Sequence, residues 1–180
     1  MTTPIQTIEL HPAAAPLATI VVLHGLGAPG TGPADPFSRQ EDETGLRDSF
    51  AGVHALLDRE VARGVPAERI VLAGFSQGCA ITLGAGLRYG QRLAGLAGLS
   101  GYLPLAAHTA AERQAANAAT PVFGAHGSRD GVVVPARGRA SRDALLALGQ
   151  PVDWHEYPME HSVCLEEVRE LEAWLKQVLA

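Results

Sequence analysis

A serine that could act as a nucleophile stands at the centre of the sequence Gly-Phe-Ser-Gln-Gly, at positions 74–78. This spelling is typical of a sharp strand-to-helix turn that presents the serine hydroxyl for attack on a carbonyl carbon. Glycine at 74 and 78 suits the turn, because side chains two residues before or after the serine would collide there. The chain holds 20 glycines, so the apolar run at 70–73 and the helix-compatible run after the turn carry the prediction that Ser76 is a nucleophile.

A nucleophilic serine needs a base and an orienting carboxylate, and in chains with this turn they follow in the order acid, then histidine. Asp130 lies in a loop just past an expected strand, whereas Asp143 falls on an expected helix and Asp153 begins a strand. His161 follows the last expected strand, where a loop can bring its imidazole to the serine. We predict that Asp130 orients the imidazole and that His161 is the base.

Other polar residues near strand ends have a simpler structural interpretation. His24 and His126 each precede a glycine and are expected to brace loops, and Cys79 is expected to be a small buried side chain. The letters Gly-Leu-Gly-Ala-Pro-Gly at 25–30 match a dinucleotide-binding turn, but prolines at 29, 33 and 36 exclude the helix that must follow it. We therefore expect no dinucleotide cofactor and, since the histidines lack ligand spacing, no metal.

The elements that would position these residues indicate an α/β fold. Short apolar runs at 5–10, 18–24, 70–74, 93–100, 121–126 and 152–157 alternate with amphipathic runs at 44–63, 77–87, 105–117, 136–148 and 165–179. This alternation predicts a mostly parallel sheet of about six strands with helices on both faces. We find no internal repeat and expect one domain over residues 1–180.

Composition narrows the classes of partner. The 180-residue chain is 47% apolar with a formal net charge of −5, and its Lys and Arg are dispersed, which excludes a nucleic-acid surface. No run approaches the ~20 apolar residues of a spanning helix, and no leader pattern is present. We expect a cytoplasmic protein with a small acyl ester substrate and no membrane insertion. A homodimer is left open.

The two cysteines, Cys79 and Cys164, are expected to be free thiols, with a disulfide between them as the alternative.

The chain resembles bacterial carboxylesterases that are close relatives of acyl-protein thioesterases and lysophospholipases, all α/β-hydrolases. The similar segments are residues 23–27, 69–78, 99–104, 126–130 and 161–164. The resemblance implies the same triad of Ser76, Asp130 and His161. It further implies an oxyanion hole made by the backbone N–H groups of Leu26 and Gln77, and a substrate contact at Leu103.

The chain departs from this family in two places. Residues 28–42 replace an expected helix, strand and substrate-lining loop, as if one βα unit were missing, and Glu160 stands where the family usually has glycine. Without the missing strand, we expect residues 5–10 and 18–23 to pair as an antiparallel hairpin. We also expect an open acyl groove, bounded by Leu26, by Leu103 and by the valine run at 132–134, which contains Val133.

The sequence thus predicts a serine hydrolase that cleaves small carboxylic esters through an acyl-serine intermediate. An acyl-protein thioesterase or a lysophospholipase is the alternative among enzymes. A hydrolase-like binding or scaffold protein, inactive after loss of the missing segment, is the alternative outside enzymes.

Overall fold

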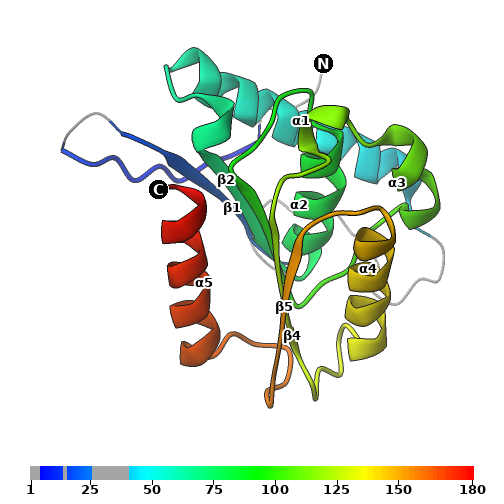
Figure 1. Cartoon of the computed structure of the whole chain (residues 1–180). Helices are drawn as coiled ribbons and strands as arrows, with labels where there is room; N and C mark the ends of the chain where they lie inside the picture. Colours follow the sequence, from blue (N-terminus) through cyan, green and yellow to red (C-terminus); the bar gives the residue numbers. More distant parts are fainter. Residues whose placement is uncertain (1–4, 14–15, 26–40) are drawn as a thin grey trace.

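A five-stranded parallel sheet forms the centre of the molecule (Figure 1). The computed structural model describes residues 5–13, 16–25 and 41–180. Neighbours in the sheet follow chain order, and all four pairs are parallel. The strands are β1 (Thr19–Leu23), β2 (Ile70–Phe75), β3 (Gly95–Leu99), β4 (Val122–Gly127) and β5 (Val152–Tyr157).

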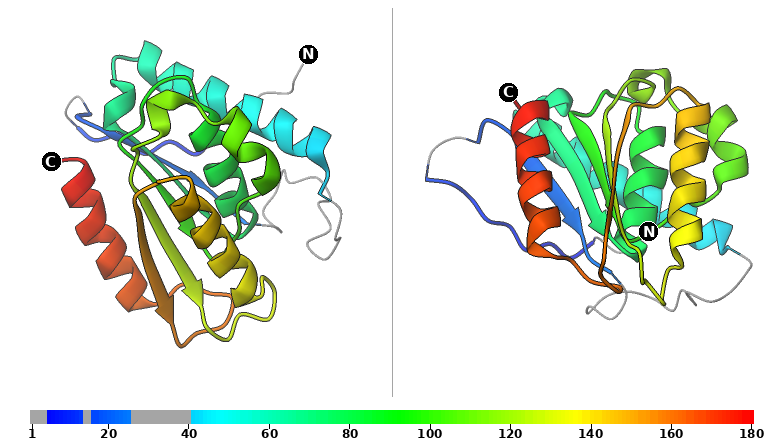
Figure 2. Two further views of the ribbon diagram at one scale, coloured as in Figure 1. Left: turned by 45° about the vertical axis from the view of Figure 1, so that its right-hand side comes forward. Right: turned by 60° about the horizontal axis from the view of Figure 1, so that its bottom comes forward.

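Helices cover both faces of this sheet, as expected. Because each crossover between parallel neighbours is right-handed, the helices that connect successive strands fall on one face. The helix that follows the last strand, α5, lies on the opposite face (Figure 2). The helices are α1 (Glu43–Ala62), α2 (Gln77–Arg88), α3 (Ala106–Glu112), α4 (Pro135–Ala147) and α5 (Leu165–Val178), with short 3₁₀ turns at Ala67–Arg69 and Ala115–Asn117.

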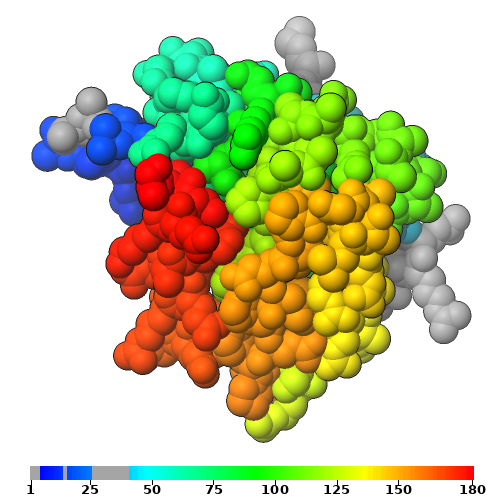
Figure 3. All heavy atoms as spheres, in the orientation of Figure 1, coloured from blue at the N-terminus to red at the C-terminus, as the bar shows by residue number. Residues whose placement is uncertain are grey.

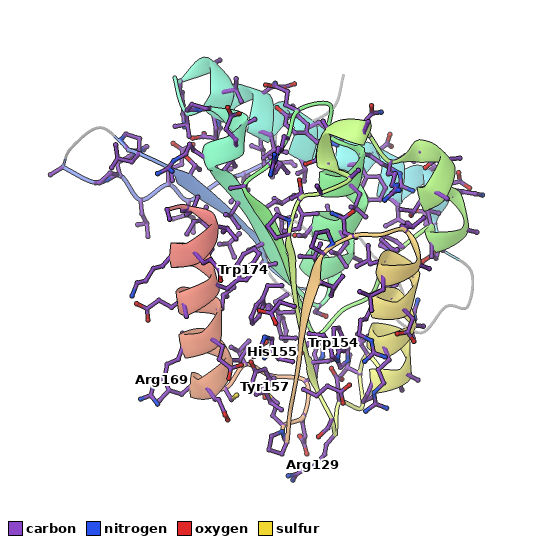
Figure 4. All side chains as sticks on the ribbon, in the orientation of Figure 1. Arg129, Trp154, His155, Tyr157, Arg169 and Trp174 are labelled. Carbon is purple, nitrogen blue, oxygen red and sulfur yellow. The ribbon has the colours of Figure 1, made fainter. Side chains whose placement is uncertain are left out.

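Two apolar cores lie on the two faces of the sheet. Successive residues of β2 serve different cores: Leu72 packs with the α1 and α2 side chains, and Val71 packs with the α5 side. On the α5 side Phe123 contacts Trp174, which points from α5 toward the sheet (Figure 4). The central strands are buried on both faces, which explains their continuous apolar sequences.

The expected N-terminal hairpin is wrong. Residues 5–10 form no strand, and β1 pairs in parallel with β2 at one edge of the described sheet, which therefore has five strands where about six were expected. The N-terminal segment lies against α1 instead, where the Glu9 carboxylate accepts hydrogen bonds from Arg59 and Arg63 at 2.8 and 3.0 Å. The arginines of these ion pairs lie about fifty positions after Glu9 in the sequence, so no local pattern reveals the contact.

The loops after β4 and β5 lie side by side at one end of the molecule, at the carboxyl ends of the strands (Figures 1 and 3). In a parallel sheet this edge collects the residues that follow each strand, and binding sites form there. The helices among the described residues include none long and apolar enough to cross a bilayer.

Candidate active site

Ser76 occupies a strained turn between β2 and α2. Its backbone angles are φ 58° and ψ −116°, a combination that non-glycine residues rarely adopt. A Cβ atom at Gly74 would strike the backbone of Gly78, and one at Gly78 would strike the carbonyl oxygen of Leu23 at the end of β1. The two glycines therefore let α2 begin in close contact with the sheet, with the serine at its first turn.

His161 joins Ser76 to Asp130 through both nitrogens of its ring. Nε2 lies 2.9 Å from the Ser76 hydroxyl oxygen, and Nδ1 lies 2.7 Å from Oδ2 of Asp130. Because a carboxylate only accepts hydrogen bonds, Nδ1 carries the proton and donates it to Asp130. In the neutral ring Nε2 is then an acceptor, so the serine hydroxyl donates to it.

The Asp130 carboxylate is buried and held by its own loop. Asp130 is 3% exposed. Its Oδ1 accepts hydrogen bonds from the backbone N–H groups of Val132 and Val133 at 2.8 and 2.9 Å, which leaves Oδ2 for His161. The two amides thus set the direction of the carboxylate before substrate arrives.

The loop after β5 brings His161 to this point, where its ring packs against Phe75 at a centroid distance of 4.8 Å. The three predicted residues follow β2, β4 and β5, and the structure brings all three together at the carboxyl edge of the sheet. This arrangement matches the hydrogen-bonded Ser-His-Asp geometry that activates a serine.

Residues 33–179 match the model of a family described as "Phospholipase/Carboxylesterase". The chain belongs to the phospholipase/carboxylesterase family. The family model covers most of the chain, from before α1 to the end of α5. The coarser form of the resemblance is therefore confirmed.

Named relatives of this family member include proteins from fungi and plants. It is 31% identical to acyl-protein thioesterase 1 of Yarrowia lipolytica over 97% of both chains. It is 40% identical to acyl-protein thioesterase 1 of Neurospora crassa over 92% of this chain and 71% of that protein. Solved structures of Arabidopsis thaliana SOBER1 (TM-score 0.84, 26% identity, 91% and 99% covered) and Zea mays acyl-protein thioesterase 2 (0.78, 27%, 95% and 97%) share its fold.

The Yarrowia comparison also bears on the length of the chain. The alignment extends over 221 positions, whereas this chain has 180 residues. The relative therefore carries residues that this family member lacks, in agreement with the expected shortening.

The predicted oxyanion hole is only partly described. Gln77 is the first residue of α2, so its N–H has no carbonyl one turn earlier to bind within the helix. Leu26 lies outside the described residues. The residue before it, Gly25, lies beside Ser76, since a Cβ there would be 3.2 Å from the Ser76 Cβ. The described chain therefore reaches Ser76 one residue before Leu26.

The two predicted substrate contacts are buried. Leu103 is 4% exposed and packs in the core on the α1 and α2 side, and its N–H donates to the Ser141 hydroxyl. Val133 is 7% exposed. Neither offers much surface to an acyl chain, and their role as substrate contacts stays a prediction.

Val132, the first residue of the valine run predicted as an apolar wall, faces the open side of the site. It is 43% exposed and helps line a hollow of about 550 Å³ beside His161. Val132 and Val134 are exposed on either side of the buried Val133, and no pattern in the sequence distinguishes the three valines.

Two charged side chains line the same hollow. Arg129, labelled at the lower end of Figure 4, and Glu160 form no ion pair with any described residue. Glu160 is exposed, and the carboxylate that binds the imidazole is that of Asp130. The Glu160 carboxylate therefore belongs to the wall of the hollow and does not bind the imidazole.

The two cysteines, Cys79 and Cys164, are free thiols. Burial raises the pKa of Cys79 to about 12, so this thiol stays protonated and inert at neutral pH. Within the part of the chain that the structure describes, no group of three or more His, Cys, Asp or Glu residues is placed to hold a metal ion.

Proposed function

We propose that this protein is a serine hydrolase, a carboxylesterase that cleaves small carboxylic esters through an acyl-serine intermediate. One observation carries the proposal: the continuous hydrogen-bonded chain from Ser76 through His161 to Asp130. Membership of the phospholipase/carboxylesterase family supports it.

The first half-reaction transfers the acyl group to the enzyme. The Ser76 oxygen attacks the ester carbonyl carbon while its proton passes to Nε2 of His161, and the negative charge of Asp130 stabilises the imidazolium. The carbonyl oxygen becomes an oxyanion that accepts hydrogen bonds from the amides of Gln77 and Leu26. When the intermediate collapses, the bond to the leaving oxygen breaks and His161 returns its proton to that oxygen, which leaves as an alcohol.

The second half-reaction releases the acid. His161, again neutral, removes a proton from a water molecule as the water oxygen attacks the acyl carbon. Collapse of the second intermediate breaks the bond to Ser76, whose oxygen takes the proton from His161. One water is consumed, one carboxylic acid is formed, and the enzyme regains its starting state.

A thioester of an acylated protein is the second candidate substrate. Its support is the name of the fungal relatives, acyl-protein thioesterase 1, at 31% and 40% identity. The same acyl-serine chemistry applies, with a thiol as the leaving group. A lysophospholipase would likewise use this triad. The hydrogen-bonded chain from Ser76 to Asp130 disfavours an inactive scaffold, because loss of function would remove the constraint that keeps these side chains in contact.

Labelling with a fluorophosphonate probe tests the proposal, because the probe forms a stable bond only with an activated serine. We expect one adduct, at Ser76, and none in Ser76→Ala. Ser100→Ala is the matched control: Ser100 also follows a strand and has a positive φ of 48°, but it is fully buried. It should leave labelling unchanged. A wild-type protein that folds but takes no label would identify the inactive scaffold.

A further inference from the structure

His126, at the end of β4, lies next to the site although the reaction as derived gives it no role. It is 1% exposed. Its Nε2 is 2.8 Å from the carbonyl oxygen of Val133 and 3.5 Å from Oδ2 of Asp130. The sequence predicted a loop-bracing residue here. The contacts show which loop His126 braces: the one that holds the triad carboxylate.

The partners of His126 determine its tautomer. A carbonyl oxygen only accepts hydrogen bonds, so Nε2 carries the proton and donates it to Val133. Nδ1 then bears a lone pair, and it finds no hydrogen-bond partner among the described residues. A neutral ring with this single donor is thus aimed at the peptide that follows Asp130.

Two neighbours keep the ring in this orientation. On one side it stacks on Trp154 at a centroid distance of 6.3 Å, with 26° between the ring planes. Figure 4 shows Trp154 on the side of β5 that faces α4, whereas His155 and Tyr157 lie toward α5. On another side α4 approaches so closely that a Cβ at Gly138 would lie 2.5 Å from Nδ1. The ring cannot turn away without displacing one of them.

We propose that His126 is a positioning residue for Asp130, acting through Val133. Val133 is bound at both ends: its N–H donates to Oδ1 of Asp130, and its carbonyl oxygen accepts from His126. Loss of the His126 donor leaves that buried carbonyl unpaired, which costs more than the hydrogen bond itself. The peptide then shifts to find another donor, and the carboxylate that it holds shifts with it. This inference rests on the proposed serine hydrolase function.

A pair of substitutions separates this role from simple packing. His126→Leu removes the donor, and we expect kcat to fall about 10- to 100-fold, the range for partners that orient a reacting group indirectly. KM should stay within about twofold, because the buried ring does not face substrate. His126→Gln places an amide N–H near the position of Nε2 and should restore most of kcat. A residue needed only for packing would not discriminate between these two replacements.

His54 supplies a matched control. Its Nε2 also binds a backbone carbonyl, that of Ala85 at 2.9 Å, but it joins α1 to α2 and is remote from the Asp130 loop. His54→Leu should lower stability without lowering kcat of the folded protein. If it lowered kcat as much as His126→Leu does, the effect would come from general destabilisation and the proposal would be wrong.

A second approach displaces the His126 ring by a substitution in the neighbouring helix α4. Gly138→Ala should press on Nδ1 and lower kcat, although alanine in a helix is intrinsically favoured over glycine. In a His126→Ala background the ring is gone, and Gly138→Ala should have no further effect, so the two changes are strongly non-additive. Gly90→Ala, at a position with nothing within 4 Å of an added Cβ, is the control and should be silent.

One readout is independent of catalysis. Hydrogen exchange of the Val132 and Val133 amides should accelerate in His126→Leu and stay slow in His126→Gln, whether or not any ester is cleaved. Unchanged exchange together with unchanged kcat in a folded His126→Leu protein would overturn the inference. If the exchange behaves as expected but wild-type protein neither cleaves esters nor takes the fluorophosphonate, the proposed function fails and the positioning of Asp130 stands.

Discussion

At the scale of single residues, the site depends on one arrangement of protons. The carboxylate oxygens of Asp130 can only accept hydrogen bonds, so Nδ1 of His161 must be the protonated nitrogen. The unprotonated Nε2 then faces the Ser76 hydroxyl. The order of donors and acceptors is therefore as important as the identity of the three residues.

Asp130→Asn tests that arrangement. The amide can donate to Nδ1, which favours the ring tautomer that carries its proton on Nε2 and cannot accept from Ser76. We expect kcat to fall roughly 10⁴-fold, while Ser76→Ala or His161→Ala should cost on the order of 10⁶-fold. Steady-state hydrolysis of a nitrophenyl ester measures these losses. Asp153→Asn is the control, since Asp153 pairs with His155 outside the site; if it alone abolished turnover, the acid would be misassigned.

At the scale of elements, two helices meet the sheet in opposite ways. Helix α2 docks through glycine, which brings its first turn onto the strand ends and places Ser76 there. Helix α5 packs on the sheet through large side chains, chiefly Trp174, and it also buries the carboxyl group of Glu167. Glu167, in the first turn of α5, is 0% exposed, and its side-chain oxygens find only the backbone N–H of Cys164 nearby, without a well-formed hydrogen bond to any described residue. The burial of the Glu167 carboxyl group therefore lowers the folding stability that α5 gains by packing on the sheet.

Glu167→Gln should reveal that cost as a pH-dependent gain in stability. Burial raises the pKa of Glu167 from 4.5 to about 7. Between these values the folded state binds a proton that the unfolded state has lost, so stability falls as pH rises from 4.5 to 7 and is constant above that. The mutant should match wild type near pH 4 and gain about 3 kcal/mol by pH 8. Urea unfolding at several pH values measures this gain.

The exposed neighbour Glu166 offers the control for that series. It shares the first turn of α5 but not the burial, so Glu166→Gln should show no such rise between pH 4.5 and 7. A flat difference between Glu167→Gln and wild type across this range would mean that the carboxyl is solvated in the folded protein.

At the scale of the whole molecule, the chain lacks residues that its Yarrowia lipolytica relative carries. The sheet described here starts at β1, whose outward side chains Ile20 and Val22 are 46% and 70% exposed. The hollow beside His161 is open and carries charged walls. We expect the lost segment to matter most for substrate choice, because a groove must enclose an acyl chain to gain from its length.

The acyl-length dependence of turnover tests this expectation. Each enclosed methylene contributes about 0.8 kcal/mol, so a closed groove would raise kcat/KM nearly fourfold per carbon. An open groove cannot, and we expect preference for acyl groups of about two to six carbons, with low turnover because few contacts orient the substrate. Nitrophenyl esters from acetate to palmitate, below their aggregation limits, provide the series, with Ser76→Ala as the blank. A steep rise continuing beyond eight carbons would show that another element encloses the chain.

The sequence by itself was sufficient for the parts of the protein that local chemistry dictates. The elbow needs glycine on both sides of Ser76, buried parallel strands need continuous apolar runs, and these requirements are legible within a few residues. The α/β class with helices on both faces followed from them and is confirmed by the structure. Asp130 and His161 could be chosen because parallel strands end at one edge, so residues that follow different strands become neighbours.

Tertiary structure decided what depends on contacts between distant segments. Glu9 pairs with Arg59 and Arg63 on α1, a contact that no local pattern reveals, and β1 pairs with β2 where a hairpin was expected. The inward turn of Val133 and the close approach of Gly138 to His126 depend on how α4 packs against β4. Short-range patterns encode which elements form and where they end. The surroundings of each side chain are set by packing between elements, which only the folded chain specifies.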